Sequence, residues 1–190
     1  MKPKVTKKYH ELLVQSSAQK VLEVLFKYPE KEFSLSDLAK ESNVAKPHIG
    51  KILKKFEDQN LITIVKLTKI WRIKANQQDL NFLRSKIGYN LNFIYLNGLI
   101  EFLNSYFGNP KSIILFGSFR NGEDISTSDI DIAIESHVDQ IISLKELSDF
   151  EKEINRKIQI HLFNRKNIDV NLFNNIVNGI KLSGFLEVKP

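Results

Sequence analysis

Two aspartates separated by one isoleucine are the residues of this sequence best suited to chemistry. Asp129 and Asp131 stand in an apolar stretch that continues to Ile134. In a strand, successive side chains point to opposite faces, so both carboxylates share one face while the isoleucines face a core. Adjacent carboxylates repel each other, and Mg²⁺, a hard cation with oxygen ligands, removes that repulsion. The spacing therefore predicts a magnesium site on a strand.

A Gly-Ser pair follows the apolar stretch just upstream. Residues 113–116 predict a strand that leads directly into Gly117 and Ser118, and ten residues separate this pair from Asp129. Glycine lets the backbone approach a phosphate closely, and a serine hydroxyl with nearby amides can hold phosphate oxygens. Alone, a Gly-Ser turn and an exposed Asp-Ile-Asp strand are both common. Together, at this spacing, they indicate a site for a phosphate and its metal ion.

This arrangement closely resembles the polymerase-beta-like nucleotidyltransferase superfamily, in particular its minimal nucleotidyltransferases, whose signature is Gly-Ser, ten residues, then Asp-x-Asp. The resemblance implies transfer of a nucleotidyl group, expected to be AMP from ATP, with Asp129 and Asp131 as catalytic Mg²⁺ ligands. By the same resemblance, Gly117 and Ser118 bind the phosphates of ATP. Arg120 stands where the family often has a small residue, and it is expected to reach the triphosphate. The acceptor implied is a partner protein or a small molecule such as an aminoglycoside.

One family feature is missing. The superfamily often places a third acidic residue on the strand that corresponds to residues 157–163, where alternation here offers Gln159, His161 and Phe163. In a two-metal mechanism a third carboxylate helps to bind one ion and activates the nucleophile. One-metal chemistry, a ligand supplied by substrate, and nucleotide binding without catalysis therefore all stay open. His161 is a candidate catalytic base, or a histidine packed at a sheet edge.

The composition is that of an ordinary globular protein. Of the 190 residues, 42% are hydrophobic and 26% charged, so the chain can bury a core. It has no cysteine, which excludes disulfides and thiolate metal sites. No apolar run is long enough to span a membrane, and the start of the chain lacks the apolar core of a signal peptide. These features favour a cytoplasmic protein with no membrane partner.

Charge divides the chain into two parts. Residues 1–78 contain 16 basic and 8 acidic residues, whereas the remainder contains 12 and 14. A basic front part joined to a nearly neutral rear part indicates two domains, at 1–78 and 79–190, of which the first favours polyanions. The polar stretch from Ala75 to Asp79 supplies the boundary.

The front domain reads as three helices and a hairpin. Apolar spacing predicts helices over 17–28, from a capping box at Ser34, and from Lys46 to Gln59, followed by strands at 61–65 and 70–73. This order, over residues 15–76, resembles the winged helix-turn-helix family, whose third helix enters the DNA major groove. The resemblance gives the expected DNA-binding residues as Lys46, His48, Lys51, Lys55, Lys66 and Lys69. The open alternative is a protein-docking or dimerisation module whose lysines only face solvent.

The rear domain is predicted to be α+β, with a mixed sheet and flanking helices. Helical spacing covers 89–107, where an aromatic-rich stripe that includes Tyr95 backs the sheet or forms a homodimer surface. A further helix is expected over 141–154 and an amphipathic segment over 167–186. Glu123 and Asp124 are expected to be loop acids only.

Two functions follow from the sequence. The first is an Mg²⁺-dependent nucleotidyltransferase that carries a DNA-binding winged helix. The second is a DNA-binding regulator whose nucleotidyltransferase-like domain binds nucleotide without catalysis.

Overall fold

The computed structural model describes residues 16–68, 70–137 and 139–188, and it divides into two compact units. In the described chain, the N-terminal unit contains residues 16–89 and the C-terminal unit residues 90–188. The division falls within helix α4 (Leu80–Leu96), later than the boundary expected after residue 78. The reason is that Phe82 and Tyr89 of this helix pack with the core of the N-terminal unit.

The predicted helices and hairpin of the N-terminal unit are present. They are α1 (Ser17–Lys27), α2 (Leu35–Ser42), α3 (Lys46–Asp58), β2 (Ile62–Lys66) and β3 (Trp71–Ala75). A two-residue strand, β1 (Glu32–Phe33), was not predicted; it pairs with β3 and completes a sheet of order β1-β3-β2. Two residues are too few to carry a recognisable alternation.

Side-chain caps explain where the first two helices begin. Ser16 and Gln19 form a reciprocal capping box at α1. At α2 the Ser34 hydroxyl accepts the Asp37 N–H at 3.1 Å, as the sequence predicted. Helix α3 has no such cap, because its N-cap residue is Ala45.

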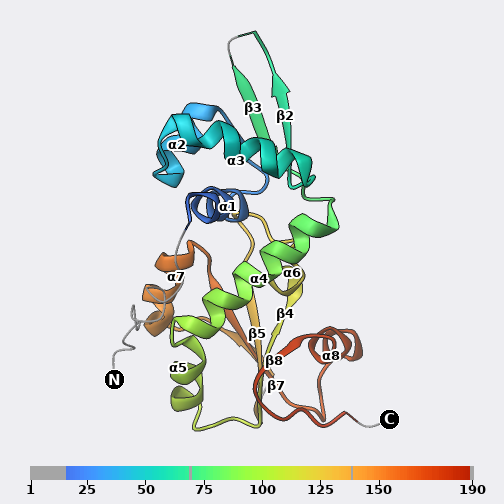
Figure 1. Cartoon of the computed structure of the whole chain (residues 1–190). Coiled ribbons are helices and arrows are strands. Elements are labelled where there is room, and N and C mark those ends of the chain that lie inside the picture. The colour runs from blue at the N-terminus through green and yellow to red at the C-terminus, as the bar shows by residue number, and fades with distance from the viewer. Residues whose placement is uncertain (1–15, 69, 138, 189–190) are drawn as a thin grey trace. The chain divides into compact units, whose positions relative to one another are not determined.

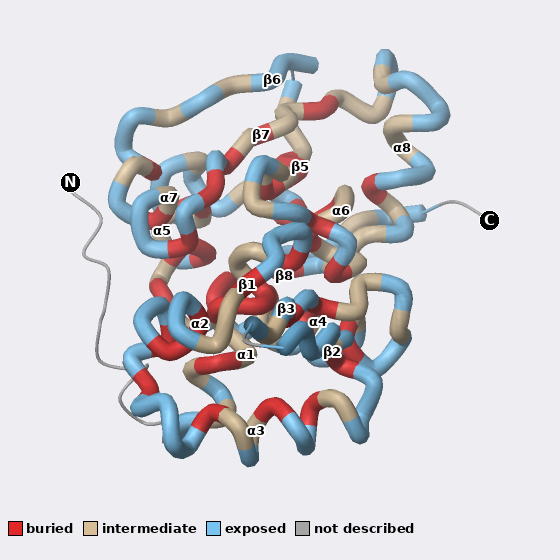
Figure 2. The backbone as a smooth tube through the Cα atoms, turned by 90° about the horizontal axis from the view of Figure 1, so that it is seen from above, coloured by how far each residue is buried: buried red, intermediate tan, exposed pale blue. Residues whose placement is uncertain are grey.

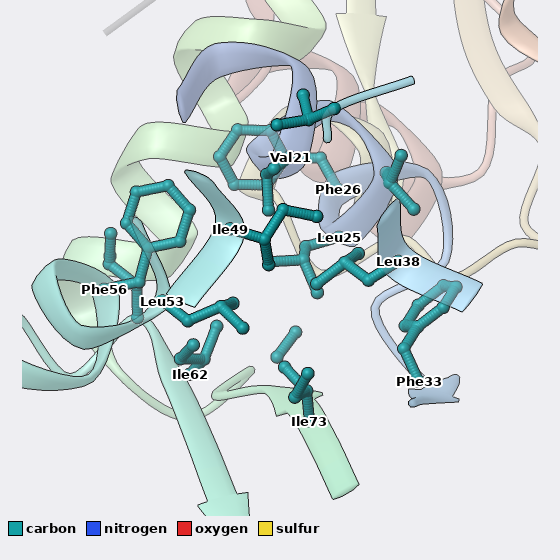
Figure 3. Packing of buried hydrophobic residues seen from close by; sticks show 14 of the residues in the cluster. Val21, Leu25, Phe26, Phe33, Leu38, Ile49, Leu53, Phe56, Ile62 and Ile73 are labelled. Atoms are coloured by element: carbon teal, nitrogen blue, oxygen red, sulfur yellow. The ribbon is translucent and has the colours of Figure 1, made fainter. Parts of the chain in front are cut away.

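The core of the N-terminal unit gathers apolar side chains from every element of that unit. Figure 3 shows Leu25 of α1, Leu38 of α2 and Leu53 of α3 packed together, with Phe33 and Ile73 from the sheet. All five are at most 1% exposed. Burial on α3 follows one stripe, and the opposite face of the helix is exposed along its length (Figure 2).

A five-stranded mixed sheet forms the centre of the C-terminal unit, which confirms the α+β prediction there. Its strands, in spatial order, are β6 (Gln140–Ile142), β7 (Ile158–Phe163), β5 (Ile130–Glu135), β4 (Ser112–Phe116) and β8 (Ile180–Gly184). Strands β5 and β7 are parallel, and the other pairs are antiparallel. The parallel pair needs a crossover, which contains the 3-10 helix η2 (Lys145–Leu147) and helix α7 (Ser148–Ile154).

Helices cover both faces of this sheet. Helix α8 (Val170–Val177) packs Ile176 against Ile114, Phe116, Ala133 and Phe163 on one face. On the other side, α5 (Leu99–Tyr106) meets α7, and the rings of Phe102 and Phe150 lie 5.9 Å apart. Figure 1 shows the sheet between α8 and these two helices.

The helix predicted over 89–107 is interrupted. It consists of α4 and α5, separated at Gly98, whose φ of 84° is left-handed and ends the helical path. The Asn97 side chain accepts the Leu99 N–H at 3.0 Å, a local bond that competes with helix continuation. The predicted apolar stripe is also wrong at Tyr95, which is 46% exposed, whereas Phe93 and Ile94 are buried.

Two further predictions of helix are wrong in part. Residues 140–142 form strand β6 instead of the start of a helix, because Ile141 and Ile142 pair with His161 and Ile160 of β7. Short apolar runs do not distinguish a helix from a strand, and long-range pairing decided the outcome here. At the other end, the amphipathic segment is helical only to Val177; Ile180 starts strand β8 beside β4.

In the part of the chain that the structure describes, no helix has both the length and the apolar character that crossing a membrane requires.

Candidate active site

The sheet presents the two aspartates as their alternation predicted. Asp131 lies in β5, directly opposite Phe116 of β4 and Gln159 of β7, while Asp129 immediately precedes the strand. Both aspartates are partly exposed, whereas Ile130 beside them is fully buried. The strand therefore anchors its apolar face in the core and turns both carboxylates toward solvent on the other.

Gly117 brings the Gly-Ser turn against this carboxylate pair. It follows Phe116, has a left-handed φ of +73°, and begins the short helix α6 (Gly117–Asn121). A Cβ at this position would collide with the Asp131 carboxylate, so only glycine allows the backbone to approach so closely. Ser118 and Arg120 lie on the same helix and are partly exposed. The structure thus brings Gly117 together with Asp131, as a metal ion shared with a phosphate would require.

The neighbouring strand supplies a polar partner for each aspartate. Gln159 Nε2 donates a hydrogen bond to Asp129 Oδ2, and His161 Nε2 lies 3.0 Å from Asp131 Oδ1. Both residues come from β7, on the face that the sequence predicted. The position expected to hold a third acid therefore holds an amide that contacts Asp129.

His161 is fixed on two sides. Its side chain is 13% exposed, and its ring meets the ring of Phe116 edge-on, with 4.9 Å between centroids. An ionised carboxylate only accepts hydrogen bonds, so Asp131 holds the ring with hydrogen on Nε2 and leaves Nδ1 as the basic nitrogen.

Two pockets of the C-terminal unit open beside these residues. One, of about 540 Å³, is lined by Asp129, the preceding loop from Ser126, helix α7 and residues 155–157. The other, of about 280 Å³, lies between β6, β7 and the start of α8, and His161 forms part of its wall. Asp129 therefore lines one pocket and His161 the other.

The carboxylate pair fits Mg²⁺ bound together with a phosphate. Within residues 16–68, 70–137 and 139–188, no three His, Asp or Glu side chains are grouped so that they could hold a metal ion. Mg²⁺ commonly takes one or two carboxylates and completes its shell with substrate phosphate oxygens and water. Asp129 and Asp131 could supply such a partial shell, and the Gly117 backbone lies directly against the Asp131 carboxylate.

Comparison with known families bears on this site. Residues 96–181 match the family model described as nucleotidyltransferase domain. The match extends from the end of α4 to β8, and it contains Gly117, Ser118, Asp129 and Asp131. It supports a nucleotidyltransferase-like function for the C-terminal unit, which is called the nucleotidyltransferase-like unit below.

Two other comparisons add little. No curated protein matches the chain. Among solved structures, the heme sensor protein PefR from Streptococcus agalactiae in complex with heme is similar at 16% identity, over 55% of this chain and 82% of that one, with a TM-score of 0.32. A likeness of this size does not bear on the fold or the ligand of this chain.

Sequence reasoning missed three buried polar residues near the site. Asp124, expected to be a loop acid, is 1% exposed and lies close to the buried side chains of Asn90 and Arg156. A single acidic residue in a loop gives no sequence signal of burial, because its partners lie far away along the chain.

The predicted DNA-binding residues of α3 all lie on its exposed face. Lys46, His48, Lys51 and Lys55 are exposed, whereas Ile49, Leu53 and Phe56 are buried. In the hairpin, Lys66 is exposed and its Nζ lies 4.9 Å from the centre of the Trp71 ring. Lys69 lies outside the described residues.

Proposed function

We propose that this protein is an Mg²⁺-dependent nucleotidyltransferase that transfers AMP from ATP to a hydroxyl of a partner protein or a small molecule. The observation that carries the proposal is the approach of the Gly117 backbone to the Asp131 carboxylate near the start of β5, the central strand of the sheet, which Asp129 immediately precedes. Close backbone approach suits a phosphate, and paired carboxylates suit its metal ion.

In this proposal each residue of the site has its own role in a single displacement at the α-phosphorus of ATP. Gly117 and Ser118 hold the phosphates, and Arg120 reaches the triphosphate. The acceptor oxygen attacks the α-phosphorus, the bond from that phosphorus to the bridging oxygen of pyrophosphate breaks, and pyrophosphate leaves with the electron pair. The acceptor proton passes to Nδ1 of His161. Asp129 and Asp131 would hold Mg²⁺, which would supply positive charge that stabilises the leaving pyrophosphate.

The pocket beside His161 is the proposed place of the acceptor. His161 lines this pocket and also contacts Asp131, so it links an acceptor bound there to a proposed metal ligand. The described residues of its wall include apolar Ile141, Ile168 and Leu172 and the carboxylates of Asp139 and Asp169, but no lysine or arginine. Such a wall favours an acceptor without phosphate groups.

A second candidate function rests on Gln159. An amide cannot provide the charge that a third carboxylate gives a second metal ion, and here it already donates to Asp129. If catalysis has been lost, the nucleotidyltransferase-like unit binds Mg²⁺ and ATP as a sensor. The protein is then a regulator that binds DNA through its N-terminal unit.

Replacing one aspartate tests the metal site without any assay of transfer. We expect Asp129→Asn to leave the melting temperature unchanged or raise it slightly in metal-free buffer, because it removes half of a repelling carboxylate pair. Mg²⁺ with ATP should raise the melting temperature of the parent protein and raise that of the variant much less, since only a ligand of the native state stabilises. Thermal unfolding with and without Mg²⁺ and ATP measures both effects.

The matched control is Asp149→Asn, because Asp149 is an exposed carboxylate of α7 that pairs with Lys152 at 3.4 Å. Its melting temperature should rise with Mg²⁺ and ATP as much as that of the parent. An equal rise in Asp129→Asn would mean that the metal ion binds elsewhere.

We further propose that the N-terminal unit binds DNA as a winged helix, with α3 against the duplex. The support is the exposure of Lys46, His48, Lys51 and Lys55 on one face of α3, together with the excess of basic residues in the front part of the chain. Arg72 contributes less, because its guanidinium donates a hydrogen bond to Glu32, which pairs its charge within the unit. Lysines favour contact with phosphates over reading of bases.

The salt dependence of DNA binding tests this role. With about four lysines on phosphates, the logarithm of affinity should fall against the logarithm of salt concentration with a slope of roughly −3 to −4. Replacing Lys51 and Lys55 with alanine should reduce the slope by roughly 2 on any duplex sequence. Fluorescence anisotropy with a labelled duplex measures the slope.

The control replaces two exposed lysines of the nucleotidyltransferase-like unit, Lys145 and Lys181, with alanine. This double variant should keep the parental slope. A full-length protein that fails to bind duplex DNA even at low salt would remove the DNA-binding proposal.

A further inference from the structure

Three buried polar side chains of the C-terminal unit form a cluster behind the candidate site. Asn90, Asp124 and Arg156 are 1%, 1% and 6% exposed, although they come from α4, from the loop after α6, and from the junction between α7 and β7. We call them the Asn90–Asp124–Arg156 cluster. None of them is a proposed metal or phosphate ligand, although Arg156 lines the pocket that Asp129 also lines.

The cluster is held together by bonds of Asn90 and an ion pair of Arg156. Asn90 Nδ2 donates to the backbone oxygen of Phe119 at 2.8 Å and to Asp124 Oδ1 at 2.9 Å. On the other side of the same carboxylate, Arg156 Nη2 lies 3.5 Å from Asp124 Oδ2. The Asn90 amide and the Asp124 carboxylate together therefore join the Phe119 carbonyl of α6 to Arg156, just before β7.

The two ends of this connection are the two halves of the proposed site. Phe119 directly follows Ser118 in α6, so a hydrogen bond to its carbonyl helps to fix the position of the Gly117-Ser118 turn. Arg156 precedes Lys157, whose backbone oxygen accepts the Ile130 N–H at 2.8 Å, and Ile130 stands between the two aspartates. The cluster thus connects the turn with the metal ligands, across the loop that separates them in sequence.

Stability alone is a weak reason for such a cluster. Removing a carboxylate and a guanidinium from water costs more than their attraction commonly repays, and apolar replacements of buried ion pairs are often as stable or more so. A fixed distance between two halves of a reaction site is a stronger reason, because a misplacement of about 1 Å can cost on the order of a hundredfold in rate.

We propose that Asn90, Asp124 and Arg156 are positioning residues, which set the placement of the Gly117-Ser118 turn relative to Asp129 and Asp131. This inference rests on the proposed nucleotidyltransferase function. It assigns these residues no contact with ATP, metal or acceptor; they act through the backbone of α6 and through the start of β5.

An apolar double replacement separates positioning from stability. The variant Asp124→Leu with Arg156→Met removes both charges at similar volume and leaves the bond from Asn90 to Phe119 in place. We expect its melting temperature to stay within a few degrees of the parent, while AMP transfer falls about a hundredfold and the affinity for Mg²⁺ with ATP falls severalfold. Thermal unfolding, calorimetry with Mg²⁺ and ATP, and release of pyrophosphate are the three measurements.

The matched control replaces another ion pair of the same unit, Glu135→Leu with Arg165→Met. Glu135 and Arg165 are 9% and 26% exposed in their side chains and lie 3.0 Å apart, at the far end of β5 from Asp129. This control should keep both the parental affinity and the parental rate. If the cluster double variant does not fold, Asp124→Asn takes its place, because it keeps the acceptor for Asn90 and removes only the charge; a tenfold loss of transfer is then expected.

The outcomes separate this inference from the proposed function. A parent that binds Mg²⁺ with ATP but transfers nothing contradicts the proposed function, and the cluster is then judged on affinity alone. A stable cluster variant with parental affinity and parental transfer would overturn the positioning role. Equal losses in the cluster variant and in the control would overturn it as well, because any buried pair would then have the same effect.

Discussion

Asp131→Ala is expected to abolish AMP transfer while the protein stays folded. Asp131 is partly exposed at the edge of the site, so its truncation leaves the core of β5 intact. The loss removes one of the two proposed metal ligands, and metal stabilisation of developing charge is worth several kcal/mol, which corresponds to roughly a thousandfold or more in rate. Release of pyrophosphate from ATP in the presence of acceptor measures the rate of AMP transfer.

The control for this variant is Glu123→Ala, an exposed carboxylate in the loop that leads to the two aspartates. It should transfer AMP at the parental rate. Parental transfer by Asp131→Ala would show that the metal ion does not bind where we propose.

His161→Ala is the second variant with a large expected effect. If His161 takes the acceptor proton, its removal should cost on the order of a hundredfold in rate, or roughly 2.7 kcal/mol. If the ring only packs against Phe116 and orients Asp131, His161→Gln should restore most of the activity, because glutamine still offers an N–H to the carboxylate. The rates of the two variants therefore distinguish base from orienting residue: a base predicts that both are slow.

Gln159→Asp tests whether the missing third carboxylate limits metal binding and rate. It replaces the amide that donates to Asp129 with a third carboxylate, so it should raise the affinity for Mg²⁺ and raise the rate. Without metal it should lower the melting temperature, because it adds a charge to a repelling pair. A variant with unchanged metal affinity would indicate that this strand takes no part in metal binding.

Much of the candidate site was predictable because its residues depend on local rules. Alternation along β5 follows from strand geometry, so Asp129 and Asp131 could be assigned to one face before any partner strand was known. The same rule assigned Gln159 and His161 to one face of β7, and these two side chains contact the aspartates. The sequence also showed a glycine after an apolar strand, and the structure adds the reason, which is the collision of a Cβ with Asp131.

Several of the incorrect predictions depend on contacts between distant residues. Ile141 and Ile142 fit a helical spacing, yet pairing with β7 makes them a strand. Asp124 is buried because Asn90 and Arg156 surround it, and neither lies near it in sequence. Local patterns indicate which way a side chain faces within its own element, but they do not say which other element will meet it.

Labelled ATP gives the most direct test of the central claim. The full chain is incubated with Mg²⁺, a cell extract and ATP labelled either at the α-phosphate or at the γ-phosphate, and acceptors are separated from free nucleotide. The account predicts that label from the α-phosphate, and none from the γ-phosphate, becomes attached to an acceptor with the parent protein and not with Asp131→Ala. If neither label is transferred while calorimetry shows that ATP and Mg²⁺ bind through Asp129 and Asp131, the protein is a nucleotide sensor and the enzymatic account is wrong.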